Sequence, residues 1–319
     1  MEIKIGNTPL IKIKYKYNDK ENQIFTKLES YNLTGSIKDR VAYYMIKEAY
    51  KKGKLKKGME IVEATSGNTG IALSAMGAFF GNKVHIFMPD WVSKERVELM
   101  KMYNAKVTLI SKEEGGFKKA ISEAKQYAKE NNAFLCNQFE NEDNVLAHYE
   151  TTGKEILEQM KEKIGGFVSG IGTGGTLMGI SKRLKEKENN IKIIALEPDK
   201  MPLLSQNKII ENHKIEGIGD DFIPEIVDKK AIDKIIIVND DDSINMSRKI
   251  ALNLGIGVGI SSGANMIASV LAKEEIEGEI VTIFADDNKK YLSTDISKPI
   301  DQNSQFISNK IQILGYEFV

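Results

Sequence analysis

The sequence predicts an α/β fold with mainly parallel, twisted sheets flanked by helices. Three observations support this prediction: short runs rich in β-branched residues recur along the 319-residue chain, amphipathic stretches separate them, and several runs are apolar without alternation. Strands that alternate with helices form parallel sheets covered on both faces, and such strands show no alternation of apolar and polar residues. Because a single hydrophobic core no longer grows in chains longer than about 250 to 300 residues, this chain is long enough for two domains.

The expected strands follow one another along most of the chain. They are MEIVEAT, KVHIFMP, AKVTLI, AFLCNQF, GGFVSGIG, IKIIALEP, DKIIIV and EIVTIFAD. The stretch DRVAYYMIKEAYKKGKL predicts a helix, because Val41, Met45 and Ala49 recur at helical spacing. No internal repeat, low-complexity tract or Pro/Ser-rich linker separates these elements, so we expect any two domains to be joined by short crossings.

Charge and composition limit what the protein binds. Lysine and arginine total 45, as do aspartate and glutamate, so no net charge attracts nucleic acid or an anionic membrane. The single cysteine, Cys136, fits a reducing compartment. The sequence shows no export signal and no apolar run of about 18 residues. We therefore expect a cytoplasmic protein that acts on small molecules, with no nucleic acid and no membrane among its partners.

Lys38 stands where a helix is expected to begin, shortly after the small residues Gly35 and Ser36. The free NH groups of a helix N-terminus carry roughly +0.5 charge, so a cation is mildly unfavourable there. A solvated surface lysine would tolerate this position at little cost. A buried lysine in positive surroundings would instead lose its proton and become a nucleophilic amine suited to forming a Schiff base. The residue alone leaves both interpretations open.

Three expected strand ends carry clusters of glycine and hydroxyl residues, and ligands of open parallel sheets bind at such ends. GTGGT, residues 172–176, offers unobstructed NH groups and two hydroxyls, as a phosphate site requires, although a close-packed turn is the alternative. TSGNT, residues 65–69, suits a carboxylate or serves only as a helix cap. GISSGAN, which contains Ser261, opens another expected helix.

An amine, a phosphate site, a carboxylate site and a neutral hydroxyl are together what pyridoxal 5'-phosphate and an amino acid require. A metal centre is not expected. The three histidines, His85, His148 and His213, lie far apart in the sequence and have no zinc-ligand spacing.

Six segments resemble, in order, the motifs of the cysteine synthase and cystathionine β-synthase family. They are IGNTPL, KLESYNLTGSIKDR, TSGNTGIAL, GIGTGGTLMGI, EGIGDDFIP and GISSGAN. The resemblance implies the tryptophan-synthase-β-like fold of fold type II pyridoxal-phosphate enzymes, as a homodimer. We expect residues 1–34 with 146–319 to form a larger, cofactor-phosphate-binding domain and residues 35–145 a smaller one. Within the smaller domain, residues 84–130 are expected to move and close over the substrate.

The resemblance also implies roles for individual residues. Lys38 would bind the cofactor as a Schiff base, Asn68 would meet its phenolic oxygen, and Ser261 would face its pyridine nitrogen. The residues expected at the phosphate are Gly172, Thr173, Gly174, Gly175 and Thr176. Those expected at the substrate carboxylate are Thr65, Ser66, Thr69 and Gln138.

A serine opposite the pyridine nitrogen makes the ring a weaker electron sink than an aspartate would, which favours β-elimination. Lys38, once displaced by the substrate amine, is the natural base for the α-proton. We therefore expect β-replacement or β-elimination on L-cysteine or a close relative through an aminoacrylate, with release of hydrogen sulfide and addition of water or a thiol. The alternatives are cysteine synthesis from O-acetylserine and sulfide, cystathionine β-synthase activity, and a non-catalytic role as a partner or sensor subunit.

The loop GIGDDFIP departs from the family's sulfhydrylases, which typically carry Ala-Gly where this chain has Asp220 and Asp221. Cystathionine synthases carry Tyr-Asp there, so Asp221 resembles the latter branch. Near FADDNKKYLST, Ala285 and Asp287 replace the usual Pro and Ser. We expect Asp221 to face Cβ of the aminoacrylate and to act as general base for the incoming nucleophile. The alternative is an aspartate that turns outward or caps a turn.

Overall fold

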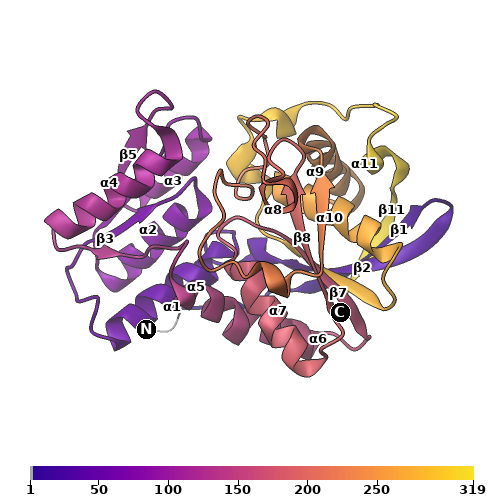
Figure 1. Cartoon of the computed structure of the whole chain (residues 1–319), viewed down its shortest axis with the longest axis horizontal. Coiled ribbons are helices and arrows are strands. Elements are labelled where there is room, and N and C mark those ends of the chain that lie inside the picture. Colours follow the sequence, from indigo (N-terminus) through magenta and orange to yellow (C-terminus); the bar gives the residue numbers. More distant parts are fainter. Residues whose placement is uncertain (1–2) are drawn as a thin grey trace.

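The computed structural model describes residues 3–319, which contain two sheets (Figure 1). The larger sheet has the strand order β11-β1-β2-β10-β7-β8-β9. Its strands are β1 (Leu10–Tyr17), β2 (Lys20–Leu28), β7 (Ile164–Gly170), β8 (Lys192–Pro198), β9 (Lys234–Val238), β10 (Glu279–Phe284) and β11 (Gln312–Phe318). β1 runs antiparallel to both of its neighbours, and the other pairs are parallel.

The smaller sheet is parallel throughout, in the order β5-β4-β3-β6. Its strands are β3 (Ile61–Ala64), β4 (Val84–Pro89), β5 (Lys106–Ile110) and β6 (Phe134–Leu135). On one face, Val62 and Phe87 pack against α4 (Gly116–Glu130). On the other, Ile61 and Ile86 pack against residues of α1 (Lys38–Lys51), α2 (Asn68–Phe80) and α3 (Lys94–Met102).

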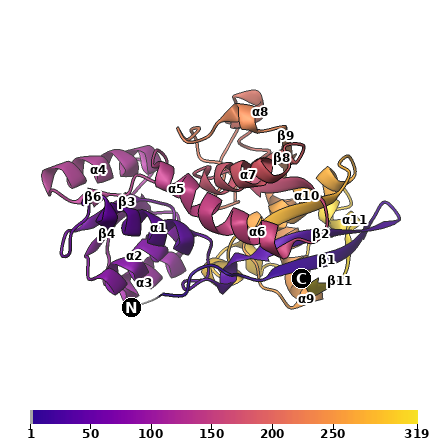
Figure 2. The same cartoon turned by 90° about the horizontal axis from the view of Figure 1, so that it is seen from below.

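Helices also cover both faces of the larger sheet; Figure 2, seen from below, has α6 and α7 in front of its strands. One face packs against α9 (Asp240–Leu254) and α10 (Ile260–Lys273), the other against α6 (Gly153–Gln159) and α7 (Gly175–Lys187). The remaining short elements are η1 (Glu29–Tyr31), α5 (Glu142–Ala147), the π-helical η2 (His148–Thr152), α8 (Leu203–Gln206), η3 (Lys229–Ala231), η4 (Asn288–Tyr291), η5 (Asp295–Ser297) and α11 (Ile307–Lys310).

The predicted fold class is confirmed, and each expected strand is present. Sequence analysis overlooked β1, β2 and β11, because it relied on continuous apolar runs, and charged residues interrupt these strands, as in LIKIKYKY. We propose that the two sheets are the cores of the two domains expected from the sequence. Between residues 3 and 319, no helix has both the length and the apolar character needed to cross a membrane.

A buried ion network lies beside the first turns of α1. It is formed by Thr8, Lys27, Glu29, Arg40 and Glu155. Arg40 donates to Glu29 Oε2 at 2.7 Å and to Glu155 Oε1 at 2.6 Å, and Lys27 Nζ donates to Glu155 Oε2 at 2.7 Å. Burial alone would raise the pKa of Glu155, but Arg40 and Lys27 lower it to about 2. The network holds the side chain of Arg40 in place. Because Arg40 is two residues after Lys38, the network also fixes the first turn of α1.

Candidate active site

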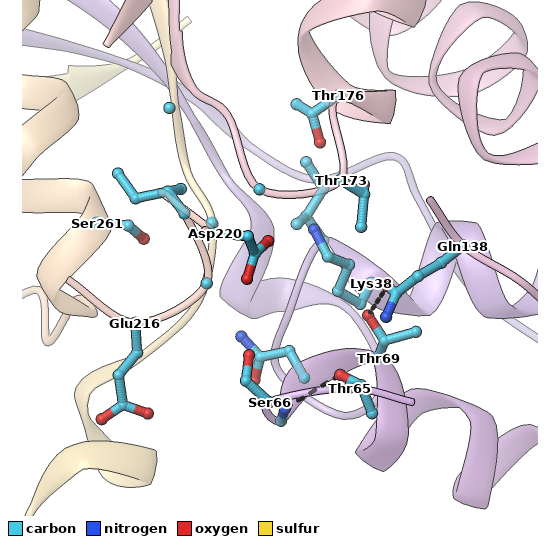
Figure 3. A pocket seen from close by; sticks show the side chains of 18 of the residues that line it. Lys38, Thr65, Ser66, Thr69, Gln138, Thr173, Thr176, Glu216, Asp220 and Ser261 are labelled. Carbon is cyan, nitrogen blue, oxygen red and sulfur yellow. Dashed lines mark hydrogen bonds between the residues drawn. The ribbon is translucent and has the colours of Figure 1, made fainter. Parts of the chain in front are cut away.

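One pocket between the two sheets brings together nearly all of the predicted site residues (Figure 3). Those that line it are Lys38, Thr65, Ser66, Asn68, Thr69, Gln138, Gly172, Thr173, Gly174, Thr176 and Ser261. Gly175, the first residue of α7, comes directly after Gly174 in the chain. The residues come from the start of α1 and from the segments that follow β3, β6, β7 and α9. Their individual roles stay predictions, but five separate segments converge as those roles require.

Lys38 is the first residue of α1, where the sequence places it, and it reaches into the middle of the pocket (Figure 3). Burial lowers the pKa of its amine below the ordinary value for lysine. The carboxylates of Asp286 and Asp220 partly oppose this shift. The free amine therefore loses its proton more readily than a surface lysine, as a nucleophile or a base must.

The segment 65–69 joins β3 to α2 and forms the lower edge of the pocket in Figure 3. Thr69 Oγ1 donates to Gln138 Oε1 at 2.7 Å, and Gln138 Nε2 donates to the carbonyl of Ala64 at 2.9 Å. A Cβ at Gly67 would lie 2.3 Å from the side chain of Arg96, so any larger residue here would have to displace that buried side chain. The N-terminus of α2 and the hydroxyls before it offer donors suited to a carboxylate.

Beneath this segment lies Glu63, whose side chain is buried. Its carboxylate accepts hydrogen bonds from the backbone NH of Ala64 at 2.8 Å and of Gln138 at 3.0 Å. Burial raises the pKa of Glu63 to about 8. Glu63 thus connects the two segments predicted to hold the substrate carboxylate without entering the pocket itself.

The segment 172–176 turns from β7 into α7 with little room for side chains. A Cβ at Gly172 would lie 2.2 Å from the carbonyl oxygen of Gly217, and one at Gly175 would lie 2.0 Å from Asn144 Oδ1. Gly174 has a φ of +92°, which also favours glycine. The close approach leaves backbone NH groups at the start of a 13-residue helix, which suits a phosphate.

Two side chains hold the hydroxyls of this segment. Asn144 Nδ2 donates to Thr173 Oγ1 at 2.9 Å, and His148 Nε2 lies 3.2 Å from Thr176 Oγ1. Burial holds the pKa of His148 well below its usual range, so its imidazole is neutral. A phosphate here would therefore be bound by NH groups and hydroxyls rather than by a cation.

The pocket fits pyridoxal phosphate in its polar groups. Asn68 lines the pocket, and its Oδ1 is buried without a hydrogen-bond partner among the described residues. Buried polar atoms normally find partners, so an unpaired amide oxygen in the pocket wall indicates a polar ligand. An amine, a neutral serine hydroxyl, an amide and a phosphate-binding helix start are the groups that this cofactor needs.

Asp221 lies outside this pocket, contrary to the expectation that it would face the reacting carbon. Its side chain is 38% exposed, and its carboxylate is 2.9 Å from Lys118 Nζ. The preceding residue, Asp220, lines the pocket instead, beside Lys38 in Figure 3. The chain bends at Asp221 and Phe222, and only Asp220 faces the pocket. Burial and the charge of Asp221 raise the pKa of Asp220 to about 6, although Lys38 opposes the shift.

Sequence analysis also missed Asp286, because it considered the neighbouring Ala285 and Asp287. Asp286 is buried and accepts hydrogen bonds from Asn68 Nδ2 at 2.7 Å and from the Tyr291 hydroxyl at 2.6 Å. The guanidinium of Arg96, in α3, lies 4.6 Å from the centre of the Tyr291 ring and pairs with Glu216. These contacts connect Asn68 and Arg96, from helices of the smaller sheet, to Asp286 and Tyr291, which follow β10 of the larger sheet. The partners are too distant in sequence for any local motif to reveal them.

Comparison with known proteins identifies the family. The family model described as "Pyridoxal-phosphate dependent enzyme" matches residues 1–286. A cysteine synthase from Staphylococcus aureus is 43% identical over 293 residues, which cover 91% of this chain and 94% of that protein. The predicted family and cofactor are thus confirmed.

Two solved structures are similar over nearly the whole chain. A hydrogen sulfide-producing enzyme from Fusobacterium nucleatum has a TM-score of 0.94 and 48% identity, covering 99% of this chain and 97% of its own. An O-acetylserine-dependent cystathionine β-synthase from Helicobacter pylori has a TM-score of 0.84 and 34% identity, covering 93% and 99%. The chain therefore belongs to the pyridoxal-phosphate dependent enzymes, and it is a β-replacing enzyme of sulfur amino-acid metabolism.

Proposed function

We propose that the enzyme cleaves L-cysteine or a close relative, releases hydrogen sulfide and adds water or a thiol to the resulting aminoacrylate. The observation that carries this proposal is the carboxylate of Asp220 in the pocket beside Lys38. By resemblance, sulfhydrylases have a small residue at this point of the loop. A carboxylate is useful there when the incoming nucleophile must lose a proton.

The first half of the reaction is the loss of the α-proton and of the thiol. Bound pyridoxal phosphate supplies the electron sink that acidifies the Cα–H bond. Thr65, Ser66, Thr69 and Gln138 bind the substrate carboxylate and so orient Cα toward Lys38. The lowered pKa of Lys38 keeps its free amine available as the base that removes the α-proton.

The second half depends on Asp220. With a pKa of about 6, its carboxylate is ionised at neutral pH and accepts the proton of the attacking water or thiol. Hydrosulfide, already an anion near neutral pH, needs no such base. A variant of the F. nucleatum enzyme with one aspartate changed to asparagine was solved with an α-aminoacrylate intermediate. This supports a role for an aspartate after the elimination step, which we give to Asp220 rather than Asp221.

Cysteine synthesis from O-acetylserine and sulfide is the second candidate, since the S. aureus relative is a cysteine synthase. Cystathionine β-synthase activity is the third, supported by the H. pylori enzyme. We further propose that the protein is a homodimer and acts in the cytoplasm on small amino acids.

Product analysis of the purified holoenzyme separates these activities. The enzyme is mixed with L-cysteine, L-serine or O-acetylserine, each with and without sulfide or a thiol, and products are identified by mass. We expect sulfide from L-cysteine, together with serine or a thioether. Formation of cysteine from O-acetylserine and sulfide, with no sulfide released from L-cysteine, would replace the proposal with cysteine synthase.

A further inference from the structure

The buried side chain of Asn144 contacts two segments of the cofactor pocket from behind its wall. Asn144 is in α5 and does not itself line the pocket. Its Nδ2 donates to the backbone carbonyl of Gln138 at 2.8 Å and to Thr173 Oγ1 at 2.9 Å. Gln138 and Thr173 reach the pocket from segments that follow strands of the smaller and of the larger sheet (Figure 3). One amide thus joins the segment expected at the substrate carboxylate to the segment expected at the phosphate.

The orientation of the Asn144 amide follows from its partners. A carbonyl oxygen only accepts hydrogen bonds, so the group 2.8 Å from the Gln138 carbonyl must be the NH₂ of Asn144. Both hydrogens of that NH₂ are then used, one for each segment. The amide oxygen lies against Gly175, where a Cβ would come within 2.0 Å of it. A larger residue at position 175 would therefore displace the Asn144 side chain.

Close packing of α7 against the helix of Asn144 holds this arrangement. Gly175 and Gly179 are four residues apart and therefore lie on one face of α7. A Cβ at Gly179 would lie 2.3 Å from the carbonyl oxygen of Val145. Asn144 and His148 are also four residues apart, and each contacts one hydroxyl of the phosphate segment. The glycines thus let Asn144 approach that segment to hydrogen-bond distance.

The two donors at Thr173 Oγ1 decide where its hydrogen points. Oγ1 accepts from Asn144 Nδ2 at 2.9 Å and from the backbone NH of Gly175 at 3.4 Å. A hydroxyl has two lone pairs and one hydrogen, so both lone pairs are occupied and the hydrogen is left to donate. Because Thr173 lines the pocket, that hydrogen is available to an anionic oxygen bound there. Without Asn144, the hydroxyl would be free to rotate and turn its hydrogen away.

Gln138 is held through its backbone as well as through its side chain. Its carbonyl accepts from Asn144, and its NH donates to the buried carboxylate of Glu63 at 3.0 Å. Its side chain bonds Thr69 and the carbonyl of Ala64, which leaves one hydrogen of Nε2 for a ligand. Asn144 and Glu63 therefore fix the peptide groups on both sides of Gln138, and with them the direction of that hydrogen.

We propose that Asn144 is a positioning residue for both the cofactor and the amino-acid substrate. It directs the hydroxyl of Thr173 to the cofactor phosphate and holds Gln138 in place for the substrate carboxylate. The inference rests on the phosphate role predicted for Thr173 and on the part of the proposed function that gives Gln138 the substrate carboxylate. It is independent of which sulfur compound the enzyme uses, because every α-amino acid carries this carboxylate.

Two pairs of ligands measure the two effects separately. The apoprotein is titrated with pyridoxal 5'-phosphate and with pyridoxal, which lacks the phosphate, and the absorbance band of the lysine-bound cofactor gives each dissociation constant. The holoenzyme, saturated with cofactor, is then titrated with L-alanine and with ethylamine, which lacks the carboxylate, and the change in the same band is followed. L-Alanine has no leaving group at Cβ, so its binding is measured without elimination.

Asn144→Ala should raise the dissociation constants of pyridoxal 5'-phosphate and of L-alanine by about 3- to 10-fold each, as the loss of one hydrogen bond implies. The values for pyridoxal and ethylamine should stay near those of the parent. Asn144→Leu keeps the volume of the side chain but not its hydrogen bonds, so it should have the same effects. This second variant keeps the test valid if the alanine variant folds poorly.

Asn141→Ala is the matched control, because Asn141 belongs to the same segment but bonds neither Gln138 nor Thr173. Its side chain accepts from the backbone NH of Asp143 at the start of α5 and donates to the carbonyl of Cys136. Loss of this helix cap should lower the melting temperature. All four dissociation constants should stay at the parental values.

Double variants show whether Asn144 acts through the two residues that it contacts. Thr173→Val removes the hydroxyl, so adding Asn144→Ala should not weaken cofactor binding further. Gln138→Ala removes the side-chain donor, so adding Asn144→Ala should not weaken L-alanine binding further. Effects that fail to add in this way indicate direct coupling between neighbouring residues.

Three results would overturn the inference: additive effects in either double variant, unchanged dissociation constants in Asn144→Ala, or equal effects of Asn144→Ala on the ligands with and without the charged group. A fourth result concerns the proposed function and is recognised by the single variant Gln138→Ala. If that variant binds L-alanine like the parent, the carboxylate role given to Gln138 is wrong, and the inference falls with it.

Discussion

Lys38 and Arg40 stand two residues apart at the start of α1, yet their surroundings are opposite. Arg40 is saturated, because its guanidinium binds Glu29 and Glu155 within the buried ion network. Lys38 has carboxylates nearby but no ion pair among the described residues, and burial lowers the pKa of its amine. The fully paired guanidinium of Arg40 therefore supports the structure, whereas the unpaired amine of Lys38 is available for chemistry.

The same contrast separates the carboxylates of the two regions. The pKa of Glu155 is lowered to about 2 by its cationic partners, while that of Asp220 is raised to about 6 by burial and by Asp221. Glu155 therefore stays ionised over the physiological range. Asp220 can take up and release a proton near neutral pH, which general-base catalysis requires.

The largest effect is expected from a change of Lys38, the residue with the chemical role. Lys38→Ala should abolish turnover and the absorbance band of the lysine-bound cofactor, because both the covalent link and the base are lost. The melting temperature of the apoprotein should stay close to that of the parent apoprotein, since Arg40 keeps its partners. Turnover near the parental rate would rule out the role predicted for Lys38.

The next largest effect is expected from a change of Arg40, the residue with the structural role. Arg40→Met should lower the free energy of unfolding by about 3 to 5 kcal/mol, because Glu29 and Glu155 would remain buried without their main partner. Urea denaturation of the apoprotein measures the change. Adding Glu29→Gln should recover part of the loss by removing one buried charge. A loss below about 1 kcal/mol would mean that the network does not support the fold.

A smaller effect is expected from Asp220→Asn. Formation of the aminoacrylate from L-cysteine should stay near the parental rate, while its reaction with water should slow by about 10²- to 10⁴-fold. In the parent, the rate of this second step should fall as the pH drops through about 6, because only the ionised carboxylate accepts a proton. Rapid-mixing absorbance measures both steps. If Asp221→Asn slows the reaction with water instead, the original sequence-based choice of base is the right one.

The effect that is smallest over any single pH unit concerns Glu63. Its folded-state pKa of about 8 lies above the usual 4.5, so the folded protein keeps a proton that the unfolded chain loses between these values. Stability should therefore decrease as the pH rises across this window, by up to about 1.4 kcal/mol per pH unit. Glu63→Gln should flatten that slope. Melting temperatures of parent and variant at several pH values provide the measurement, and parallel slopes would contradict the prediction.

Local sequence was enough to predict the converging segments but not every side chain that acts in them. Gly172 and Lys38 belong to motifs whose residue types indicate both a turn into a helix and a chemical role, so their place in the pocket could be predicted from the sequence. Asp220 and Asp221 are chemically identical neighbours, and which one faces inward depends on how the loop packs against the rest of the molecule. Asp286 contacts Asn68, a partner 218 residues away, which single-sequence patterns cannot reveal.

Some strands could likewise be predicted from local sequence, and others could not. β7 and β8 carry apolar residues without strict alternation and lie inside the parallel part of the larger sheet. β1 alternates lysine with apolar residues, because only one of its faces is buried, and it was overlooked. Its antiparallel pairing with β11 joins the two ends of the chain, which a reading from one element to the next does not detect.

The position of the pocket between two sheets has a consequence for the lifetime of the protein. Lys38 packs with the smaller sheet through α1, whereas the phosphate segment belongs to the larger sheet through β7 and α7. A cofactor attached to Lys38 and held at its phosphate would tie the two halves together. Because a ligand that binds only the folded state stabilises it, the supply of this vitamin-derived cofactor would set the rate at which proteases degrade the enzyme.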